Sequence, residues 1–360
     1  MNDDHFMKQA VALALKARGF TSPNPLVGAV VVRNGKIIGR GYHKKAGEDH
    51  AEVAAFKDAL KKKNAVKGST LYVNLEPCSH FGATPPCVEE IVEMGVKKVC
   101  FSHIDPSKKV NGKGARFLRK NGVEVKNGVL ENEARLVNQP FLKMAKSGMP
   151  YVTLKAGMSL DGKIATKKGS SKWITSGASR EHARSLRVSY DAIVVGAGTV
   201  IADNPRLNMG GGKSLRVIVD GKLRSSLKSR VFCDENVFVA YSGLASAGNV
   251  EAFEGANVKM KSFGKNKVDV KKMLAYLAKE FGIQSVFVEG GGEVHGSFVD
   301  ASLVDDIYFY IAPKIIGGED AVDVVKGGGV SNLKDVLKFK KTDVSKLKDD
   351  ILIHGIVNEY

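Results

Sequence analysis

Residues 50–60 read HAEVAAFKDAL and residues 69–78 read STLYVNLEPC. The first stretch has the spacing of an amphipathic helix, and the second begins as an apolar strand and ends on a proline and a cysteine. Around this pair the sequence predicts strands over 27–32, 36–42 and 98–102 and helices over 5–18 and 86–94. This alternation of strands and helices predicts a three-layered α/β domain with a partly parallel sheet.

Three side chains in and after these stretches can hold a metal ion. His50, Cys78 and Cys87 offer one imidazole and two thiolates, a set that suits a tetrahedral zinc with its fourth position left for water. Glu52 stands two residues after the histidine, where the H-x-E pattern of zinc deaminases places the group that moves protons. A bound zinc would lower the pKa of its water to about 7 and so supply a nucleophile for an amidine carbon.

The spacing of the two cysteines departs from the nucleobase deaminases. Eight residues, 79–86, separate Cys78 from Cys87, where those enzymes have two. Each cysteine follows a proline, a residue favoured in the first helical turn, so we expect both to lie at helix N-termini, which lower thiol pKa. Two other interpretations stay open: a structural zinc site that also uses His80, and a metal-free pair of buried cysteines.

Composition limits the partners that this chain of 360 residues can have. Its net charge is +17, with 25 Lys and Arg against 14 Asp and Glu in residues 1–147 and 30 against 24 in residues 148–360. The excess is spread over both parts without an arginine-rich aromatic stripe, so we expect phosphate-bearing small molecules and no nucleic acid. No run is apolar enough to span a membrane, and four cysteines are too few for a disulfide framework. We therefore predict a cytoplasmic protein without a membrane partner.

A second alternating pattern follows a bridge at residues 139–150, which predicts two different domains, 1–147 and 148–360. Its predicted strands cover 151–156, 192–195, 215–220, 236–241, 285–288 and 307–312, and its helices 179–189 and 268–281. The run EGGG at 289–292 follows a strand and opens a helix, so its backbone N–H groups can bind a pyrophosphate. A tight turn is the other interpretation of this run.

Together these motifs resemble the bifunctional riboflavin-biosynthesis deaminase–reductases. The N-terminal resemblance lies in PNPLVG (23–28), GYH (41–43), HAE (50–52), EPCSH (76–80) and TPPC (84–87). The C-terminal resemblance lies in SLDGKIA (159–165), SKWIT (171–175), GTV (198–200), ADNP (202–205), VEGG (288–291) and APK (312–314). It covers essentially the whole chain, and it implies a cytidine-deaminase-like α/β/α domain followed by a dihydrofolate-reductase-like α/β domain.

The resemblance implies two consecutive reactions. The first is zinc-dependent removal of the pyrimidine amine of 2,5-diamino-6-(5-phosphoribosylamino)pyrimidin-4(3H)-one. The second is reduction of the ribosyl group of the resulting uracil ribotide to a ribityl chain, with NADPH as the reductant. We further expect a homo-oligomer, a dimer or a tetramer. The alternatives are a nucleic-acid-editing deaminase with an accessory domain and a zinc-binding scaffold with impaired activity.

Carried over by position, the resemblance assigns roles to single residues. The zinc ligands are His50, Cys78 and Cys87, with Glu52 as the catalytic proton carrier. The pyrimidine pocket contains Asn24, His43 and His80, and the reductase substrate is contacted by Ser171, Arg187, Leu207 and Glu289. NADPH is contacted by Gly157, Trp173, Thr199, Asp203, Gly291, Gly292, Glu293, Val294, His295, Gly296 and Ser297. Trp173 as a core residue and Arg187 as a surface cation are the alternative interpretations.

The chain departs from the family pattern where phosphate groups are expected. Ala83 stands in place of a basic residue, Ser107-Lys108 in place of Asn-Pro, and Gly210 in place of an arginine. Lys108, Lys109 and Arg206 are candidates to restore the lost positive charge. Asp161 is a further candidate polar residue near the cofactor.

Overall fold

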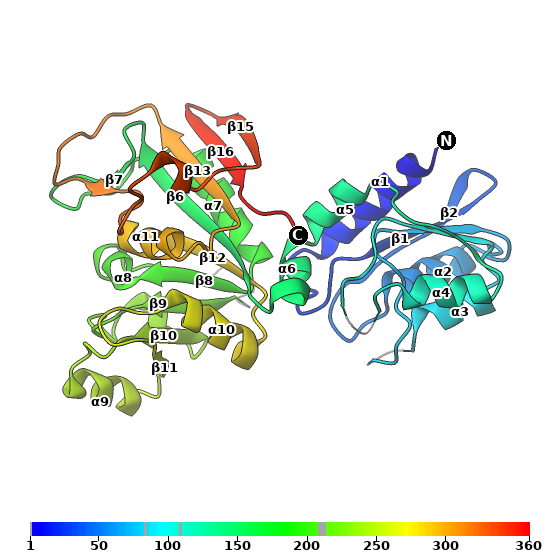
Figure 1. Cartoon of the computed structure of the whole chain (residues 1–360), viewed down its shortest axis with the longest axis horizontal. Coiled ribbons are helices and arrows are strands. Elements are labelled where there is room, and N and C mark those ends of the chain that lie inside the picture. Colours follow the sequence, from blue (N-terminus) through cyan, green and yellow to red (C-terminus); the bar gives the residue numbers. More distant parts are fainter. Residues whose placement is uncertain (1, 83–84, 108–109, 208–213) are drawn as a thin grey trace. The chain divides into compact units, whose positions relative to one another are not determined.

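The computed structural model of the chain describes residues 2–82, 85–107, 110–207 and 214–360 (Figure 1). The chain forms two units, residues 1–148 together with Tyr360 and residues 149–359, and each is described by itself. In the described ranges, no helix has both the length and the apolar character needed to cross a membrane.

The N-terminal unit is built on a five-stranded sheet in the order β2-β1-β3-β4-β5. Its strands are β1 (Gly28–Arg33), β2 (Lys36–Tyr42), β3 (Thr70–Val73), β4 (Lys98–Phe101) and β5 (Glu124–Lys126). Strand β1 pairs antiparallel with β2 and β3, while β3, β4 and β5 run parallel. The carboxyl ends of β3 and β4 therefore meet at one edge of the sheet, where the loops that follow them begin.

Helices cover both faces of this sheet. Side chains alternate along β1: Val30 and Val32 pack with α1 (Asp3–Ala14), and Ala29 and Val31 pack with the helices of the opposite face. Those helices are α2 (Ala51–Lys61), α3 (Cys87–Glu93) and α4 (Lys113–Lys120). The bridge predicted at 139–150 is largely helix α6 (Gln139–Ser147), preceded by α5 (Glu131–Val137). The expected three-layered arrangement is confirmed.

The C-terminal unit contains a nine-stranded sheet in the order β11-β10-β9-β8-β12-β6-β13-β16-β15. The seven strands from β11 to β13 run parallel, and β16 is antiparallel to both of its neighbours. The strands are β6 (Tyr151–Ser159), β8 (Ala192–Gly196), β9 (Leu215–Val219), β10 (Val237–Tyr241), β11 (Lys259–Ser262), β12 (Ser285–Gly290), β13 (Asp306–Ala312), β15 (Lys341–Leu347) and β16 (Asp350–Ile356). A separate two-stranded sheet joins β7 (Lys163–Ala165) and β14 (Val322–Asp323).

Helices also cover both faces of the larger sheet (Figure 1). Helices α10 (Val270–Phe281) and α11 (Gly292–Asp300) pack on one face, and α7 (Gly177–Leu186), α8 (Ala197–Asp203) and α9 (Ala247–Gly255) pack on the other. All six strands predicted for this half are present. Strands β11, β15 and β16 were not predicted. The edge strands β11 and β15 are mostly exposed and lack a clear apolar alternation.

Gly41 in β2 allows helix α2 to approach the sheet closely. A Cβ atom built on Gly41 would lie 2.3 Å from the backbone N of Ala55 and 2.4 Å from the carbonyl O of Ala51. Backbone atoms cannot move aside as the end of a side chain can, so overpacking here shifts the start of α2. We expect Gly41→Ala to destabilise the N-terminal unit by about 1–3 kcal/mol.

Urea unfolding followed by circular dichroism measures this change. The chain has one tryptophan, Trp173 in the C-terminal unit, so its fluorescence reports unfolding of that unit separately. Gly82→Ala is the matched control, because a Cβ atom on Gly82 meets no atom of the described residues within 4 Å. Identical unfolding curves for Gly41→Ala and the wild type would contradict the close approach of helix and strand.

Candidate functional site

The three expected zinc ligands lie together in the N-terminal unit. His50 is the N-cap of α2, Cys78 lies in the loop after β3, and Cys87 is the first residue of α3. The Nδ1 atom of His50 is 3.1 Å from the Sγ of Cys87 and 3.5 Å from the Sγ of Cys78, and all three ligand atoms lie within 4.8 Å of one another. Nitrogen and sulfur ligands of one tetrahedral zinc are about 3.5 Å apart, so the three side chains fit this ion.

The expectation that both cysteines begin helices is wrong for Cys78. Residues 76–79 have no regular secondary structure, so Cys78 is not part of a helix. The backbone N–H of Cys87 donates to the Sγ of Cys78 over 3.3 Å, and the N–H of Val88 donates to the Cys78 carbonyl oxygen over 3.3 Å. Both sulfur atoms therefore lie at the N-terminus of α3. Cys87 is part of this helix, and Cys78 is outside it but accepts a hydrogen bond from its first N–H group.

The two thiols and His50 form one electrostatic unit. Hydrogen bonding from Cys87, together with that from His50, lowers the pKa of Cys78 to about 4 in spite of burial. The pKa of Cys87 is raised, because Cys87 donates to the Cys78 sulfur and is itself buried. Two neighbouring sulfurs that share one proton offer a divalent cation a site at which it can displace that proton and neutralise both thiolates.

Glu52 lies in the first turn of α2 with only 3% of its surface exposed. Burial raises its pKa to about 7, and the negative charge of Cys78 adds to this effect, while His50 and hydrogen bonding to Cys87 oppose it. A carboxyl group with a pKa near neutrality can both accept and release a proton at physiological pH.

Asn24 and His43 lie beside the zinc ligands. The Nδ1 of His43 is 3.0 Å from the carbonyl oxygen of Asp49, which can only accept, so Nδ1 carries the proton and Nε2 accepts from the Asn24 amide over 3.0 Å. Burial lowers the pKa of His43, which favours this neutral form. Its ring meets that of His50 edge-on with 5.5 Å between centroids. His80 lies in the loop after Cys78, and within the described ranges its buried Nδ1 has no hydrogen-bond partner.

Glu76 has a supporting role that sequence reasoning missed. Its buried carboxylate accepts hydrogen bonds from the backbone N–H groups of Asp105 (3.3 Å), Gly112 (2.9 Å) and Ala115 (3.0 Å). It therefore ties the segment that carries Cys78 to the loop after β4 and to the first turn of α4. The signal was present in the sequence, because a glutamate at the end of an apolar strand is buried only when its charge is partnered.

Several positions that depart from the family pattern cannot be placed. Ala83, Lys108, Lys109 and Gly210 lie outside the described residues. Ser107 is described, and its backbone N–H donates to the Oδ1 of Asp105 over 2.7 Å.

A cleft of about 1380 Å³ opens in the C-terminal unit where the parallel strands end. Its lining includes the residues that follow β8, β9, β10 and β12, as expected for ligand sites in parallel sheets. Ten of the eleven predicted cofactor residues line it: Gly157, Trp173, Thr199, Asp203, Gly291, Gly292, Glu293, Val294, His295 and Ser297. Ser171 and Glu289 of the predicted substrate contacts also line it.

Three predicted residues do not line this cleft. Gly296 packs against the backbone, because a Cβ atom there would lie 1.8 Å from the carbonyl oxygen of Lys326. Leu207 is buried in the hydrophobic cluster that contains Ile193 and Phe287. Arg187 is absent from the described lining, but it donates hydrogen bonds to Glu289, which does line the cleft. Arg206, the candidate substitute cation, is exposed and is also absent from the lining.

Glu289 is held by two cations. The Nε of Arg187 donates to its Oε1, the Nη2 of Arg187 donates to its Oε2 over 2.8 Å, and the Nζ of Lys155 lies 3.4 Å from Oε2. Burial alone would raise the pKa of Glu289, but Lys155 and Arg187 hold that pKa below its usual value, so the carboxylate is ionised. Lys155 also lines the cleft and was missed; its signal is a single lysine inside the apolar strand β6.

Trp173 and Asp161 have roles that the structure makes clear. Trp173 is 61% exposed, and the guanidinium of Arg180 lies 4.2 Å from its ring centroid, so its interpretation as a core residue is wrong. The Asp161 carboxylate accepts from the backbone N–H groups of Ile316 (3.1 Å) and Gly317 (2.7 Å), which makes it a support for that loop. It is not among the described residues that line the cleft.

Comparison with known proteins gives two family matches. The family described as "RibD C-terminal domain" matches residues 150–353, and the family described as "Cytidine and deoxycytidylate deaminase zinc-binding region" matches residues 1–103. The riboflavin biosynthesis protein RibD of Bacillus amyloliquefaciens is 42% identical, with 98% of this chain and 96% of the relative covered. That of Escherichia coli is 35% identical, with 98% of this chain and 99% of the relative covered.

Solved structures agree over the same length. RibD of Acinetobacter baumannii gives a TM-score of 0.87 at 36% identity and covers 99% of each chain. The diaminohydroxyphosphoribosylaminopyrimidine deaminase/5-amino-6-(5-phosphoribosylamino)uracil reductase of Thermotoga maritima gives 0.86 at 38% identity, with 99% of this chain and 98% of that chain covered. The expected fold, a cytidine-deaminase-like domain followed by a dihydrofolate-reductase-like domain, is confirmed.

The role of Glu76 predicts that its loss loosens the zinc ligands without removing any of them. In Glu76→Ala three backbone N–H groups lose their acceptor, and we expect a lower thermal midpoint and faster loss of metal to a chelator. The measurement is zinc release into a chromogenic chelator. Glu124→Ala is the control, since that carboxylate is exposed and pairs with Lys98 at the surface. Equal release rates in all three proteins would show that Glu76 does not position the loop.

Proposed function

The chain belongs to the RibD family of bifunctional riboflavin-biosynthesis enzymes, and on this premise we propose how its residues carry the two reactions. It deaminates the diaminopyrimidine ribotide in its zinc-binding half and reduces the resulting uracil ribotide in its NADPH-dependent half. The nucleic-acid-editing alternative is not favoured, because the similarity to this family extends through the reductase half.

The convergence of His50, Cys78 and Cys87 beside a buried carboxyl group is the observation that carries the deaminase assignment. We propose that these three side chains hold the zinc ion, which when bound activates a water molecule as the nucleophile. Glu52 then accepts the proton that the attacking water loses and delivers it to the departing amine. A pKa of about 7 suits both transfers, because neither direction is strongly opposed at neutral pH.

The pyrimidine is oriented by the neighbouring polar side chains. One N–H of the Asn24 amide is engaged by His43, which leaves its carbonyl oxygen and its other N–H to pair with the edge of a heterocycle. The Asp49 carbonyl fixes the tautomer of His43 and so fixes the direction of the Asn24 amide. The buried Nδ1 of His80 supplies a further polar contact for the ligand.

In the reductase half, the lining of the cleft around Gly157, Trp173, Thr199, Asp203 and the start of α11 is the proposed NADPH site. Its size and the backbone N–H groups at the α11 N-terminus fit a dinucleotide with a diphosphate. When bound, NADPH supplies the hydride.

Substrate contacts in this half come from the end of the cleft that contains Glu289. Glu289 and Lys155 contact the ribosyl group there, with the Lys155 ammonium placed to donate a proton to the oxygen that becomes a hydroxyl. Ser171, which lines the same cleft, is proposed as a further substrate contact. Arg187 is a positioning residue, which keeps Glu289 ionised and fixed. Leu207 and Gly296 contribute through packing.

The two proposed activities belong to two consecutive domains of the chain. We propose residues 1–147 as the deaminase domain and 148–360 as the reductase domain, a boundary that α6 supports by ending at Ser147 with the left-handed Gly148 as its cap. A homo-oligomer, dimer or tetramer, and a cytoplasmic location follow from the family premise. Light scattering coupled to size exclusion tests the oligomer.

A reciprocal pair of variants tests the assignment. Glu52→Gln cannot carry a proton, so we expect it to stop ammonia release from the diaminopyrimidine ribotide while it still oxidises NADPH with the pre-deaminated substrate. We expect Glu289→Gln to lose NADPH oxidation with the pre-deaminated substrate while it still releases ammonia from the diaminopyrimidine ribotide. Ammonia release and NADPH absorbance are followed separately on each substrate. Ammonia release by Glu52→Gln, or loss of both activities in either variant, would contradict these roles.

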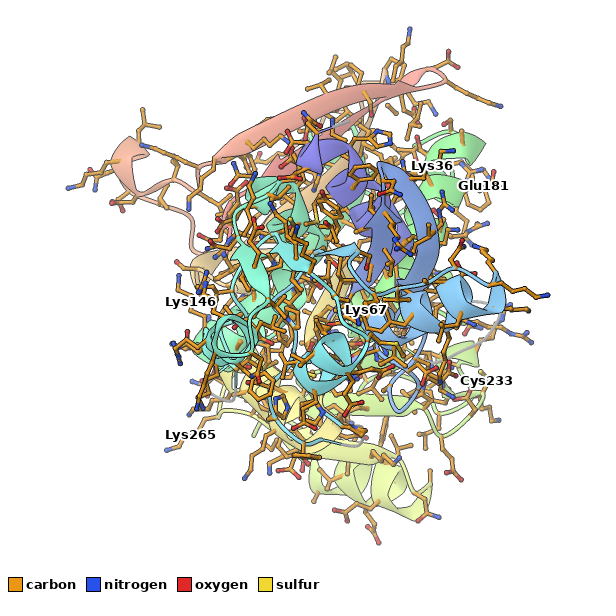
Figure 2. All side chains as sticks on the ribbon, turned by 90° about the vertical axis from the view of Figure 1, so that its right-hand side faces the viewer. Lys36, Lys67, Lys146, Glu181, Cys233 and Lys265 are labelled. Atoms are coloured by element: carbon orange, nitrogen blue, oxygen red, sulfur yellow. The ribbon has the colours of Figure 1, made fainter. Side chains whose placement is uncertain are left out.

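Zinc content tests the ligand set. We expect about one zinc per chain after dialysis in the wild type and a large loss in Cys78→Ser and Cys87→Ser, because a serine hydroxyl is a poor zinc ligand. Metal analysis by mass spectrometry measures this content. Cys233→Ser is the control, since Cys233 is exposed and belongs to the other unit (Figure 2). His80→Ala should keep its zinc; loss of zinc there would favour a structural site with four protein ligands.

A further inference from the structure

The segment that leads into β1 lies outside the strand pairing of the N-terminal sheet. Residues 25–27 have no regular secondary structure, and the pairing of β1 begins with Gly28 on one side and Ala29 on the other. This segment follows Asn24, the amide proposed to contact the pyrimidine. Backbone N–H and C=O groups that leave the surface need partners, which a neighbouring strand ordinarily supplies. Here side chains supply them.

Two buried asparagine side chains hold the backbone of Leu26. The Leu26 N–H donates to the Oδ1 of Asn138 over 2.8 Å, and the Nδ2 of Asn138 donates to the Leu26 carbonyl oxygen over 3.0 Å. The Nδ2 of Asn74 donates to the same carbonyl oxygen over 2.9 Å, and its Oδ1 accepts from the Gly28 N–H over 2.8 Å. Asn74 is fully buried and Asn138 is 2% exposed. An amide is buried only when its polar atoms are partnered, and in both residues one short segment provides the partners.

The two asparagines come from different parts of the unit. Asn74 directly follows β3 and so belongs to the segment that carries Cys78. Asn138 lies between α5 and α6, 112 positions from Leu26. Its own N–H donates to the Arg135 carbonyl oxygen over 3.0 Å, and its carbonyl oxygen accepts from the Leu142 N–H over 2.9 Å. The two helices therefore fix Asn138 independently of the zinc ligands.

A short and stiff connection joins Leu26 to the pyrimidine pocket. Only Pro25 separates Leu26 from Asn24, and the proline ring fixes its own φ angle, so the position of Leu26 limits where Asn24 can lie. The Asn24 amide donates to the Nε2 of His43 over 3.0 Å. The backbone N–H of His43 in turn donates to the Val27 carbonyl oxygen over 2.9 Å. Both polar side chains of the pocket therefore depend on the segment that the asparagines hold.

We propose that Asn138 is a positioning residue for pyrimidine binding in the deaminase half. It acts through Leu26, whose backbone it holds by two directional hydrogen bonds, and so fixes the Asn24 amide against the edge of the bound ring. The inference rests on the proposed deaminase function. A displacement of about 1 Å in a substrate-positioning group can cost about a hundredfold in rate, so a contact that only holds such a group has a measurable effect.

Steady-state kinetics of ammonia release separate this role from a contribution to folding. We expect Asn138→Ala to raise the KM of the diaminopyrimidine ribotide by at least about tenfold with a smaller change in kcat, because a contact to the ring edge serves binding. A residue that only stabilised the fold would lower the active fraction, and so lower kcat per chain at an unchanged KM. Asn64→Ala is the matched control, since its amide donates to the Ile38 carbonyl oxygen over 3.3 Å in the same unit.

A double-mutant cycle tests whether Asn138 acts through Asn24. If it does, Asn24→Ala/Asn138→Ala has the same KM as Asn24→Ala alone, because the group that Asn138 positions is already absent. Increases in KM that multiply in the double variant, or an unchanged KM in Asn138→Ala, overturn the inference. Asn138→Asp keeps the acceptor for the Leu26 N–H and loses only the donor. It is the milder variant, with the same direction of change expected, if the alanine variant does not fold.

Nuclear magnetic resonance of the full chain with ¹⁵N-labelled histidine tests the same inference without catalysis. The Nε2 of His43 accepts from Asn24, so its chemical shift reports the position of that amide. We expect Asn138→Ala and Asn24→Ala to move this resonance in the same direction and Asn64→Ala to leave it in place. An unmoved resonance in Asn138→Ala overturns the inference whatever the activity. A wild type that releases no ammonia contradicts the proposed function alone.

Discussion

A buried carboxylate stays ionised only when the protein supplies its partners, and both sites of this chain are built on that constraint. The Glu76 carboxylate accepts hydrogen bonds from three backbone N–H groups and so fixes the segment that carries Cys78. Glu289 accepts hydrogen bonds from Arg187 and Lys155, and so it remains ionised at the cleft that Lys155 also lines. At Glu52 burial outweighs the stabilising contacts, and its pKa rises to about 7. The surroundings of a buried glutamate therefore decide whether its carboxyl group is ionised or has a pKa near neutrality.

Parallel strands bring these groups together. In the N-terminal unit, the loops after β3 and β4 meet at the carboxyl edge of the sheet, which is where Glu76 bonds to Asp105. In the C-terminal unit, the same edge gathers the segments after β8, β9, β10 and β12 around the cleft. Helices α3 and α11 begin close to these loops, so their first N–H groups face the sites. The directional pairing of the strands thus concentrates positive backbone dipoles where thiolates and phosphates bind.

Sequence patterns predicted the parts of this arrangement that depend on near neighbours. Apolar alternation located the strands of both sheets except β5, β11, β15 and β16, and motif spacing located the three side chains that fit a zinc ion. The residues that were missed have partners far away in the chain: Lys155 and Glu289 are 134 positions apart, and Glu76 and Ala115 are 39 apart. Such pairs are set by strand order, which the period of a single strand does not contain. The prediction that Cys78 begins a helix was wrong for a related reason. The helix N-terminus that donates a hydrogen bond to its sulfur is that of α3, which begins at Cys87.

The structure also shows where part of the excess of Lys and Arg lies, which composition alone could not show. Residues 148–360 carry 30 Lys and Arg against 24 Asp and Glu. The described lining of the cleft contains nine of these cations and three of these carboxylates, so its excess of six equals that of the whole half. The other charged residues of this half, 21 Lys and Arg and 21 Asp and Glu, then balance one another. The excess positive charge of this half is therefore accounted for by the lining of the cleft, while residues 1–147 contribute the larger part of the chain's net charge, +11 of +17.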